Sequence, residues 1–214
     1  MDSFALLFVI VAVALVFDLC NGWHDGANSI SVVVYTGAMK PRTAVAMSAL
    51  FNFLGPFVVG TAVAQTIGGE VIPEFYINAN LVLAALVSAI SWDVLTWWRG
   101  LPVSSSQALV GGLVGAGIAA HGLSGVNWFG VFSKVLVPMA LSPLIGLGAG
   151  YFFMKAEDHF VQSSSTAYHR LQVGASALLS LSHGANDAQK SMGIIAVFLG
   201  QVTMEPVSMC PSGW

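Results

Sequence analysis

A polar, ionisable cluster occurs twice inside hydrophobic stretches of this chain, and this repeat narrows the folds open to it. The first copy spans residues 21–29 (NGWHDGANS) and the second spans residues 183–191 (HGANDAQKS). Aligning the glycines of the two copies places Asp25 opposite Asp187. Carboxylates and amides at membrane depth cost free energy, and they persist mainly where they bind something or line a pathway. A weak internal repeat that carries such groups favours a secondary transporter built from two related halves.

The composition indicates that the chain lies in a membrane. Hydrophobic residues make up 56% of the chain and charged residues only 8%, whereas a soluble domain carries roughly 25% charged residues. The sequence has no basic run of the kind that binds nucleic acid. Its two cysteines have no CxxC spacing that would suggest a metal site. We therefore expect an integral membrane protein in contact with lipid, with no nucleic-acid partner, no metal site and no cofactor.

Six apolar stretches are each near the roughly 20 residues that a membrane-spanning helix needs. They cover residues 4–35, 43–67, 77–98, 101–120, 129–154 and 171–200. The predicted fold class is therefore an all-α integral membrane protein with about six membrane-embedded helical segments. Because Asp2 precedes the first stretch without any Lys or Arg, we do not expect a cleaved signal peptide.

The basic residues orient these stretches in the membrane. Lys40 and Arg42 follow the first stretch, Arg99 follows the third, and Lys155 and Arg170 lie between the fifth and the sixth. If each stretch crosses once, the positive-inside rule places all of these residues in the cytoplasm and the N-terminus outside. An odd number of crossings then separates the two polar clusters, so the helices that carry them run in opposite directions. The prediction is an inverted-repeat fold in the cell (inner) membrane.

Each polar cluster also has the spacing of one helix face. Residues at i, i+3, i+7 and i+10 lie on one side of a helix; they are Asp18, Asn21, Asp25 and Asn28 in the first copy, and Ser180, His183, Asp187 and Lys190 in the second. Gly22, Gly26 and Gly184 each weaken a helix by roughly 1 kcal/mol relative to Ala. We expect a break in both helices that frees backbone groups for a site. The alternative is that the polar groups only hold helices together by hydrogen bonds.

A run of serines precedes the apolar segment that starts at residue 108. Pro102 ends any helix before it, and Ser104, Ser105 and Ser106 are good N-cap residues. A helix N-terminus presents unpaired amides and a partial positive charge, which suits an oxyanion such as phosphate. Ordinary helix capping is the alternative explanation for these serines.

Other charged residues are expected at surfaces. Asp93 lies next to Trp92 near a predicted cytoplasmic helix end, so we expect it at the membrane interface. Glu157 and Asp158, beside Lys155, are expected in a solvated loop.

The clusters and the serine motif together resemble those of the inorganic phosphate transporter (PiT) family, bacterial low-affinity type. The first cluster, followed by YTGAM at 35–39, is similar to the signature of the family's first half. Residues 182–193 (SHGANDAQKSMG) are similar to the signature of its second half. Residues 101–107 (LPVSSSQ) resemble its hairpin motif, except that Gln107 stands where a His is usual. The resemblance covers nearly the whole chain, up to about residue 200.

The resemblance implies cation-coupled symport of inorganic phosphate, with H+ or Na+ as the coupling cation, and no enzymatic activity. The phosphate would be carried either free or as a complex with a divalent metal. The implied organisation is a first repeat over residues 1–154, a cytoplasmic linker over 155–170 and the start of a truncated second repeat over 171–214. A chain of this kind is expected either to be inactive as a fragment or to work as a homodimer.

The resemblance and the spacing together nominate two sets of site residues. The expected phosphate-binding residues are Ser104, Ser105, Ser106, Asn28, Gln189 and Lys190. The expected cation-binding residues are Asp25, Asn28, Asn186 and Asp187. Because phosphate and aspartate repel each other, a bound cation must offset the charge, which is a physical reason for coupling.

Two other functions remain open from the residues alone. One is an ion channel, although a channel needs no paired halves. The other is a membrane-embedded metal-dependent hydrolase that uses His24, Asp25, His183 and Asp187. A hydrolytic metal site usually takes three protein ligands and an open position, and the sequence contains no HExxH helix.

Overall fold

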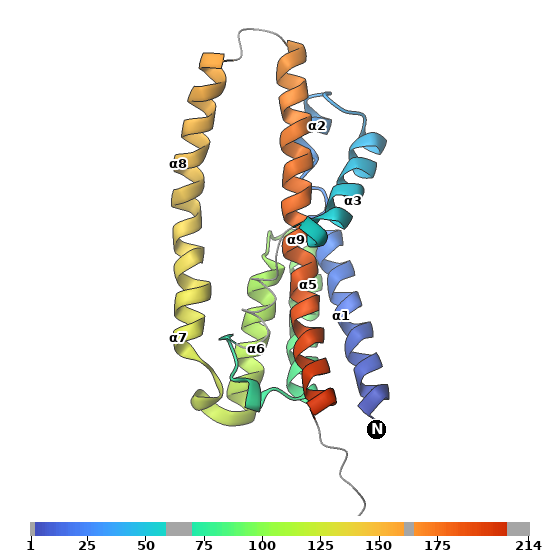
Figure 1. Cartoon of the computed structure of the whole chain (residues 1–214), viewed down its shortest axis with the longest axis vertical. Helices are drawn as coiled ribbons and strands as arrows, with labels where there is room; N and C mark the ends of the chain where they lie inside the picture. The colour runs from blue at the N-terminus through green and yellow to red at the C-terminus, as the bar shows by residue number, and fades with distance from the viewer. Residues whose placement is uncertain (1–2, 59–69, 161–164, 205–214) are drawn as a thin grey trace, which may run out of the picture. The chain divides into compact units, whose positions relative to one another are not determined.

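The chain is all-helical in the part that the computed structural model describes, which is residues 3–58, 70–160 and 165–204. Its elements are α1 (Ser3–Asp25), α2 (Ser31–Tyr35), α3 (Pro41–Val58), η2 (Glu74–Tyr76), α5 (Ala79–Arg99), α6 (Ser105–His121), η3 (Gly122–Gly125), α7 (Trp128–Gly130), η4 (Val131–Leu136), α8 (Val137–Phe160) and α9 (Ser165–Met204) (Figure 1). These described residues include no strand, which confirms the predicted all-α class. Of the predicted segments, residues 59–67, 161–164 and 205–214 lie outside the described residues.

Four helical segments are long and apolar enough to cross a membrane, so the chain is a multi-pass membrane protein. They are Ala5–Asp25, Ala79–Arg99, Ser105–Gly125 and Trp128–Glu157, and they coincide with the first, third, fourth and fifth predicted stretches. The second and sixth stretches correspond to α3 and α9, which are helical but are not among these four. With 40 residues, α9 is far longer than one span requires, since about 20 residues cross the hydrocarbon layer.

The chain divides into two compact units, and each unit combines segments that are far apart in the sequence. Unit 1 comprises Met1–Asn21, Ala62–Asn127 and Gln189–Trp214, and unit 2 comprises Gly22–Thr61 and Trp128–Ala188. The boundaries therefore fall inside both polar clusters. The two predicted repeats follow the order of the chain and are not the same as these two units. The division into repeats stays a prediction.

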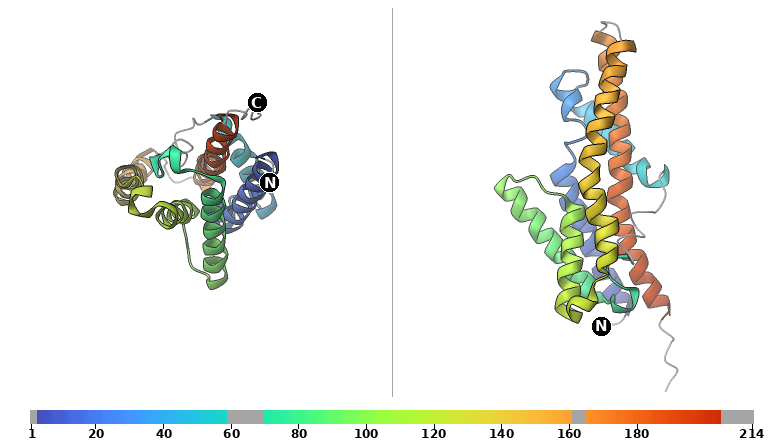
Figure 2. Two further views of the ribbon diagram at one scale, coloured as in Figure 1. Left: turned by 90° about the horizontal axis from the view of Figure 1, so that it is seen from below. Right: turned by 90° about the vertical axis from the view of Figure 1, so that its left-hand side faces the viewer.

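Unit 1 contains a helix pair, α5 and α6, that packs side by side (Figures 1 and 2). The Asn78 side chain caps α5 by accepting a hydrogen bond from the Leu81 amide, and Gly100 ends the helix with φ = 65°, a left-handed conformation that favours glycine. The two backbones approach closely at Gly112 of α6, where a Cβ atom would lie 2.6 Å from the Ala85 carbonyl oxygen. Glycine at this position allows α6 to pack directly against α5.

Unit 2 contains a second close approach, between α3 and α9. A Cβ atom on Gly184 would overlap the backbone of Asn52, and one on Gly55 would overlap the backbone of Leu181 and Ala185. Small residues at such positions let helix backbones touch within a membrane. This crossing brings the polar stripe of α9 against α3.

The predicted helix break is confirmed in the first polar cluster and is wrong in the second. Helix α1 ends at Asp25, and residues 26–30 form turns before α2 begins. A Cβ atom on Gly26 would lie 2.5 Å from the Gly22 carbonyl oxygen, so the turn requires glycine there. The second cluster runs uninterrupted through α9, because its glycine is engaged in the contact with α3 and helix-forming residues surround it.

The expectation of a solvated loop at Glu157 and Asp158 is also wrong, because both residues belong to the last turn of α8. The residues that follow the apolar run, such as Lys155 and Glu157, are good helix formers and continue the helix past the hydrophobic segment. All of the predicted linker that is described, residues 155–160 and 165–170, is therefore helical.

Candidate functional site

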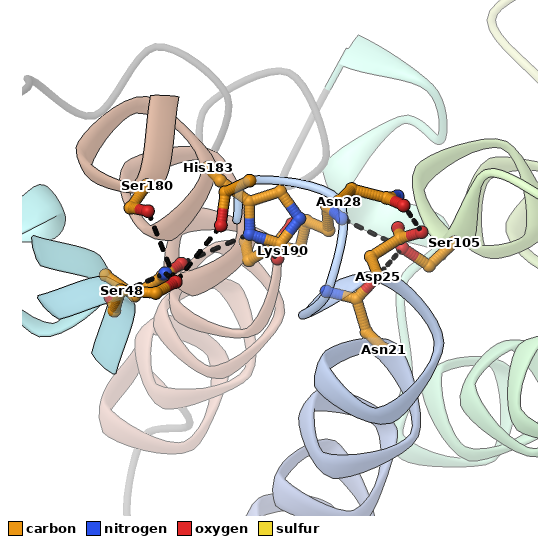
Figure 3. A network of polar contacts seen from close by, with 11 residues as sticks. Asn21, Asp25, Asn28, Ser48, Ser105, Ser180, His183 and Lys190 are labelled. Carbon is orange, nitrogen blue, oxygen red and sulfur yellow. Dashed lines mark hydrogen bonds and ion pairs between the residues drawn. The ribbon is translucent and has the colours of Figure 1, made fainter. Parts of the chain in front are cut away.

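Three buried polar side chains from distant parts of the sequence meet in unit 1 (Figure 3). Lys190 of α9 is only 2% exposed, and its Nζ donates a hydrogen bond to Ser105 Oγ at 3.0 Å. Ser105, the first residue of α6, donates in turn to Asn21 Oδ1 of α1. A buried ammonium group costs free energy unless acceptors or an anion compensate for the lost water. The hydrogen bond to Ser105 offsets part of this cost.

The predicted serines differ in what they do. Ser104 is the N-cap of α6, and its side-chain oxygen faces the Gln107 amide at 3.5 Å. Ser105 is buried and bonded to Lys190, whereas Ser106 is half-buried. Capping thus accounts for the position of Ser104, and a buried polar cluster accounts for Ser105.

Ser104 and Gln107 also line a groove between α5 and α6. The groove has a volume of about 530 Å³. Its lining residues are Ser88, Ser91, Trp92, Leu95, Val103, Ser104, Gln107, Ala108, Gly111 and Gly112. Hydroxyl groups of α5 and the amide of Gln107 in α6 therefore line the same groove of unit 1.

Unit 1 holds two carboxylates that the predicted site did not include. Asp18 of α1 accepts a hydrogen bond from Ser191 Oγ of α9. Its position in the predicted polar stripe could have identified it as a site residue. Asp93 of α5 is 1% exposed, so its side chain is buried within unit 1; its expected position at the membrane interface stays a prediction. Asp93 continues the buried face of α5 that includes Ala89 and Thr96, and this helical period could have identified it.

The end of α1 carries a second polar pair, in unit 2. Asn28 Nδ2 donates to Asp25 Oδ1 at 3.1 Å, across the turn that follows the helix. Asp25 is half-buried and Asn28 is exposed. The structure thus brings together two of the predicted cation-binding residues.

The polar stripe of α9 carries the other predicted aspartate. Asp187 Oδ2 lies 3.2 Å from Nδ1 of His183, one helical turn earlier. The same His183 nitrogen lies 3.1 Å from Asn52 Oδ1 of α3. Asn186 is exposed and lies on another face of α9 than this stripe. Gln189 is buried and belongs to unit 1.

A group of buried hydroxyls adjoins this stripe in unit 2 (Figure 3). Ser48 Oγ of α3 lies 3.0 Å from Ser29 Oγ and 3.2 Å from Ser180 Oγ. Ser176 Oγ donates to the Ser29 carbonyl oxygen at 2.5 Å. Sequence reasoning placed only Ser180 on the stripe, because no local pattern marks contacts between α3 and α9.

The four side chains of the hydrolase alternative all lie in unit 2. They are His24, Asp25, His183 and Asp187. Within the described ranges, no group of three or more His, Cys, Asp and Glu side chains is placed to hold a metal ion.

Comparisons with known proteins agree on one family. The sequence model of the phosphate transporter family matches residues 21–211. The probable low-affinity inorganic phosphate transporter of Mycobacterium bovis is 43% identical over 212 residues, which cover 97% of this chain and 50% of that protein. The relative of the same name from Streptomyces halstedii is 47% identical over 186 residues, covering 84% of this chain and 86% of that protein. The chain spans about half the length of the mycobacterial relative.

A solved structure supports the fold. The structure described as the sodium-dependent phosphate transporter matches with a TM-score of 0.81 over 96% of this chain and 70% of that chain. Its sequence is 21% identical to this chain, and the match indicates a shared helical fold.

Proposed function

The chain belongs to the phosphate transporter family, and we propose that it takes part in cation-coupled symport of inorganic phosphate across the membrane. The coupling cation is H+ or Na+, and phosphate travels free or as a complex with a divalent metal. The names of the bacterial relatives describe phosphate transport by those proteins, and the name of the structural neighbour adds sodium dependence. Both support the proposal for this chain.

The observation that carries the proposal is the buried contact between Lys190 and Ser105. An ammonium group in an apolar, membrane-embedded bundle is expensive, and such groups usually mark a pathway or a binding site. Here it lies at the N-terminus of α6, where free amides and the helix dipole also favour an anion. Phosphate would accept hydrogen bonds from Lys190, Gln189 and the hydroxyls of Ser104, Ser105 and Ser106, all of unit 1. Asn28, which lies in unit 2, stays a phosphate-binding residue predicted from the sequence.

The cation is proposed to bind at the aspartates of the two signature clusters. Asp25 with Asn28, and Asp187 with Asn186, offer carboxylate and amide oxygens, which are suitable ligands for a hard cation. Phosphate and the aspartates carry charge of the same sign, and a bound cation would lower the repulsion between them. Binding of each ion therefore favours binding of the other, which is the requirement for symport.

The proposed setting is the cell (inner) membrane, with the N-terminus outside and the basic loops in the cytoplasm. A homodimer is the proposed working form, in which two copies together provide the paired elements of a transporter. Size-exclusion chromatography with light scattering would measure the mass of the reconstituted protein.

Counterflow in proteoliposomes tests the function. Liposomes that contain the purified 214-residue chain are loaded with unlabelled phosphate, and labelled phosphate is added outside with or without a cation gradient. A symporter accumulates label transiently and does so faster with the gradient. Flux without counterflow would indicate a channel, and release of phosphate from an ester would indicate a hydrolase. Either result would overturn the proposal.

A further inference from the structure

We infer that Asn52 is a positioning residue that fixes the tautomer and orientation of His183 and so holds the carboxylate of Asp187 in place. Asn52 is outside both signature clusters, in the middle of α3. The functional meaning of the inference rests on the proposed cation role of Asp187. The positioning itself is a property of unit 2 and can be measured without transport.

The orientation of the Asn52 amide follows from its contacts with Ser48. Its Nδ2 lies 2.8 Å from the Ser48 carbonyl oxygen and 3.0 Å from Ser48 Oγ. A backbone carbonyl oxygen only accepts hydrogen bonds. The nitrogen of the amide must therefore face Ser48, because the reversed amide would put two oxygens against each other. Asn52 Oδ1 is then directed at His183.

His183 Nδ1 consequently lies between two acceptors. One is Asn52 Oδ1 at 3.1 Å, and the other is Asp187 Oδ2 at 3.2 Å. The amide oxygen of Asn52 cannot donate, so its hydrogen bond with the ring requires the proton on His183 Nδ1. In the neutral imidazole, Nε2 then carries the lone pair. The structure selects one tautomer out of two.

The position of Asn52 is itself held by the packing of unit 2. Its partner Ser48 has contacts with hydroxyls from two other segments, Ser29 after α1 and Ser180 in α9. Its backbone touches α9 at Gly184, the residue that follows His183. A side-chain network and a backbone contact thus restrain the same residue.

The consequence for Asp187 is a defined carboxylate position. Residues that hydrogen-bond to a metal ligand orient that ligand and tune its affinity for the metal. We expect Asn52 and His183 to act on Asp187 in the same way. Loss of the Asn52 contact would remove the acceptor on α3, so that among the described contacts the His183 ring would keep only the acceptor on its own helix. We therefore expect roughly tenfold weaker cation binding at Asp187 when Asn52 can no longer accept a hydrogen bond.

Nitrogen-15 NMR of histidine tests the positioning on the full 214-residue chain in lipid nanodiscs. The chain is labelled at histidine, and His183→Gln identifies the resonances of that ring among the five histidines. At a pH where imidazole is neutral, the wild type should show a protonated Nδ1 and an unprotonated Nε2. Asn52→Leu should convert this single state into a mixture of tautomers.

Ser176→Ala is the matched control. Ser176 belongs to the same buried group but bonds to the Ser29 backbone, so its loss should leave the His183 tautomer unchanged. A wild-type His183 protonated at Nε2, or an Asn52→Leu variant that keeps a single Nδ1-protonated state, would overturn the inference. The wild-type measurement decides even if Asn52→Leu does not fold.

Adding Na+ to the same samples separates this inference from the proposed function. If Asp187 binds the cation, the His183 resonances should shift with cation concentration, at roughly tenfold lower concentration in wild type than in Asn52→Leu. A fixed tautomer without any response to Na+ would reject Na+ binding at Asp187 while leaving the positioning role intact.

Discussion

At the scale of single residues, the polar side chains of this membrane protein are distinguished by what they contact. Lys190 is buried against Ser105, and Asp187 is held by His183. Asn28 bonds Asp25 across a turn. Each of these groups would be costly in hydrocarbon without its partners. Substitution of a single residue therefore tests both binding and the local network.

Replacing Lys190 with Met should weaken phosphate binding to the purified chain by about 2 kcal/mol, or roughly thirtyfold. This is the size of a lost hydrogen bond to a charged group. The folded yield of the variant, measured by size-exclusion chromatography, separates a lost phosphate contact from a lost structural contact of Lys190. Isothermal titration with phosphate gives the affinity. Lys134→Met, which removes an exposed lysine of η4, is the control and should bind phosphate normally. Equal affinities for both variants would contradict the site.

Ser105→Ala should weaken phosphate binding by roughly 1–3 kcal/mol, since it removes a hydroxyl from a dry cluster. Ser124→Ala removes an exposed hydroxyl that bonds only to the local backbone at His121, and it should have no effect on affinity. If Ser105→Ala lowered only the melting temperature of the chain, a purely structural role for this serine would follow.

Asp25→Asn and Asp187→Asn should each abolish the dependence of phosphate counterflow on the cation gradient. Each change removes the negative charge that attracts the cation but preserves the shape of the side chain. Glu157→Gln, at the end of α8, should leave that dependence unchanged. Wild-type coupling in either aspartate variant would show that the cation binds elsewhere.

At the scale of helices, glycines determine where the backbones touch. Gly112 brings α6 against α5, and Gly55 and Gly184 bring α3 against α9. The second contact matters most for the site, because it sets the distance between Asn52 and His183. The same glycine, Gly184, was expected to break its helix and instead packs inside a continuous one.

Gly184→Ala should destabilise unit 2 by about 1–3 kcal/mol, the cost of forcing extra volume into a packed contact. Gly174→Ala in the same helix is the control, because a Cβ atom there has no neighbour within 4 Å. It should be neutral or slightly stabilising, since Ala favours helix over Gly by up to about 1 kcal/mol. Thermal unfolding in detergent, followed by circular dichroism, compares the two. Equal melting temperatures would argue against a tight crossing.

At the scale of the whole molecule, the chain combines several membrane spans with loops of defined charge. Lys40, Arg99 and Lys155 follow apolar segments on what the positive-inside rule makes the cytoplasmic side. Phe75 lies in η2, just before the first residue of α5, whereas Arg99 is the last residue of that helix. These positions predict the orientation of the protein in the membrane.

Thiol labelling in intact cells should reveal that orientation. In a chain whose native cysteines, Cys20 and Cys210, are replaced by Ser, Phe75→Cys should react with a membrane-impermeant maleimide added outside. Arg99→Cys should react only after the cells are opened. Both side chains are exposed, so access depends on the side of the membrane. The reverse pattern would place the N-terminus in the cytoplasm.

The sequence by itself determined the membrane class, the all-helical fold and the two signature clusters. These properties depend on local features: apolar length, charge in the loops and residues repeated at fixed spacing. The break after Asp25 also followed from local glycines, and the serines at the start of α6 followed from capping preference.

Only the tertiary structure decided which of these residues meet. Ser105 and Lys190 are 85 positions apart, and Asn52 and His183 are 131 apart. Such contacts depend on which helix faces pack together, and hydrophobic periodicity in one segment does not specify its partner. The division into two units, with boundaries inside both clusters, likewise arises from packing between distant segments.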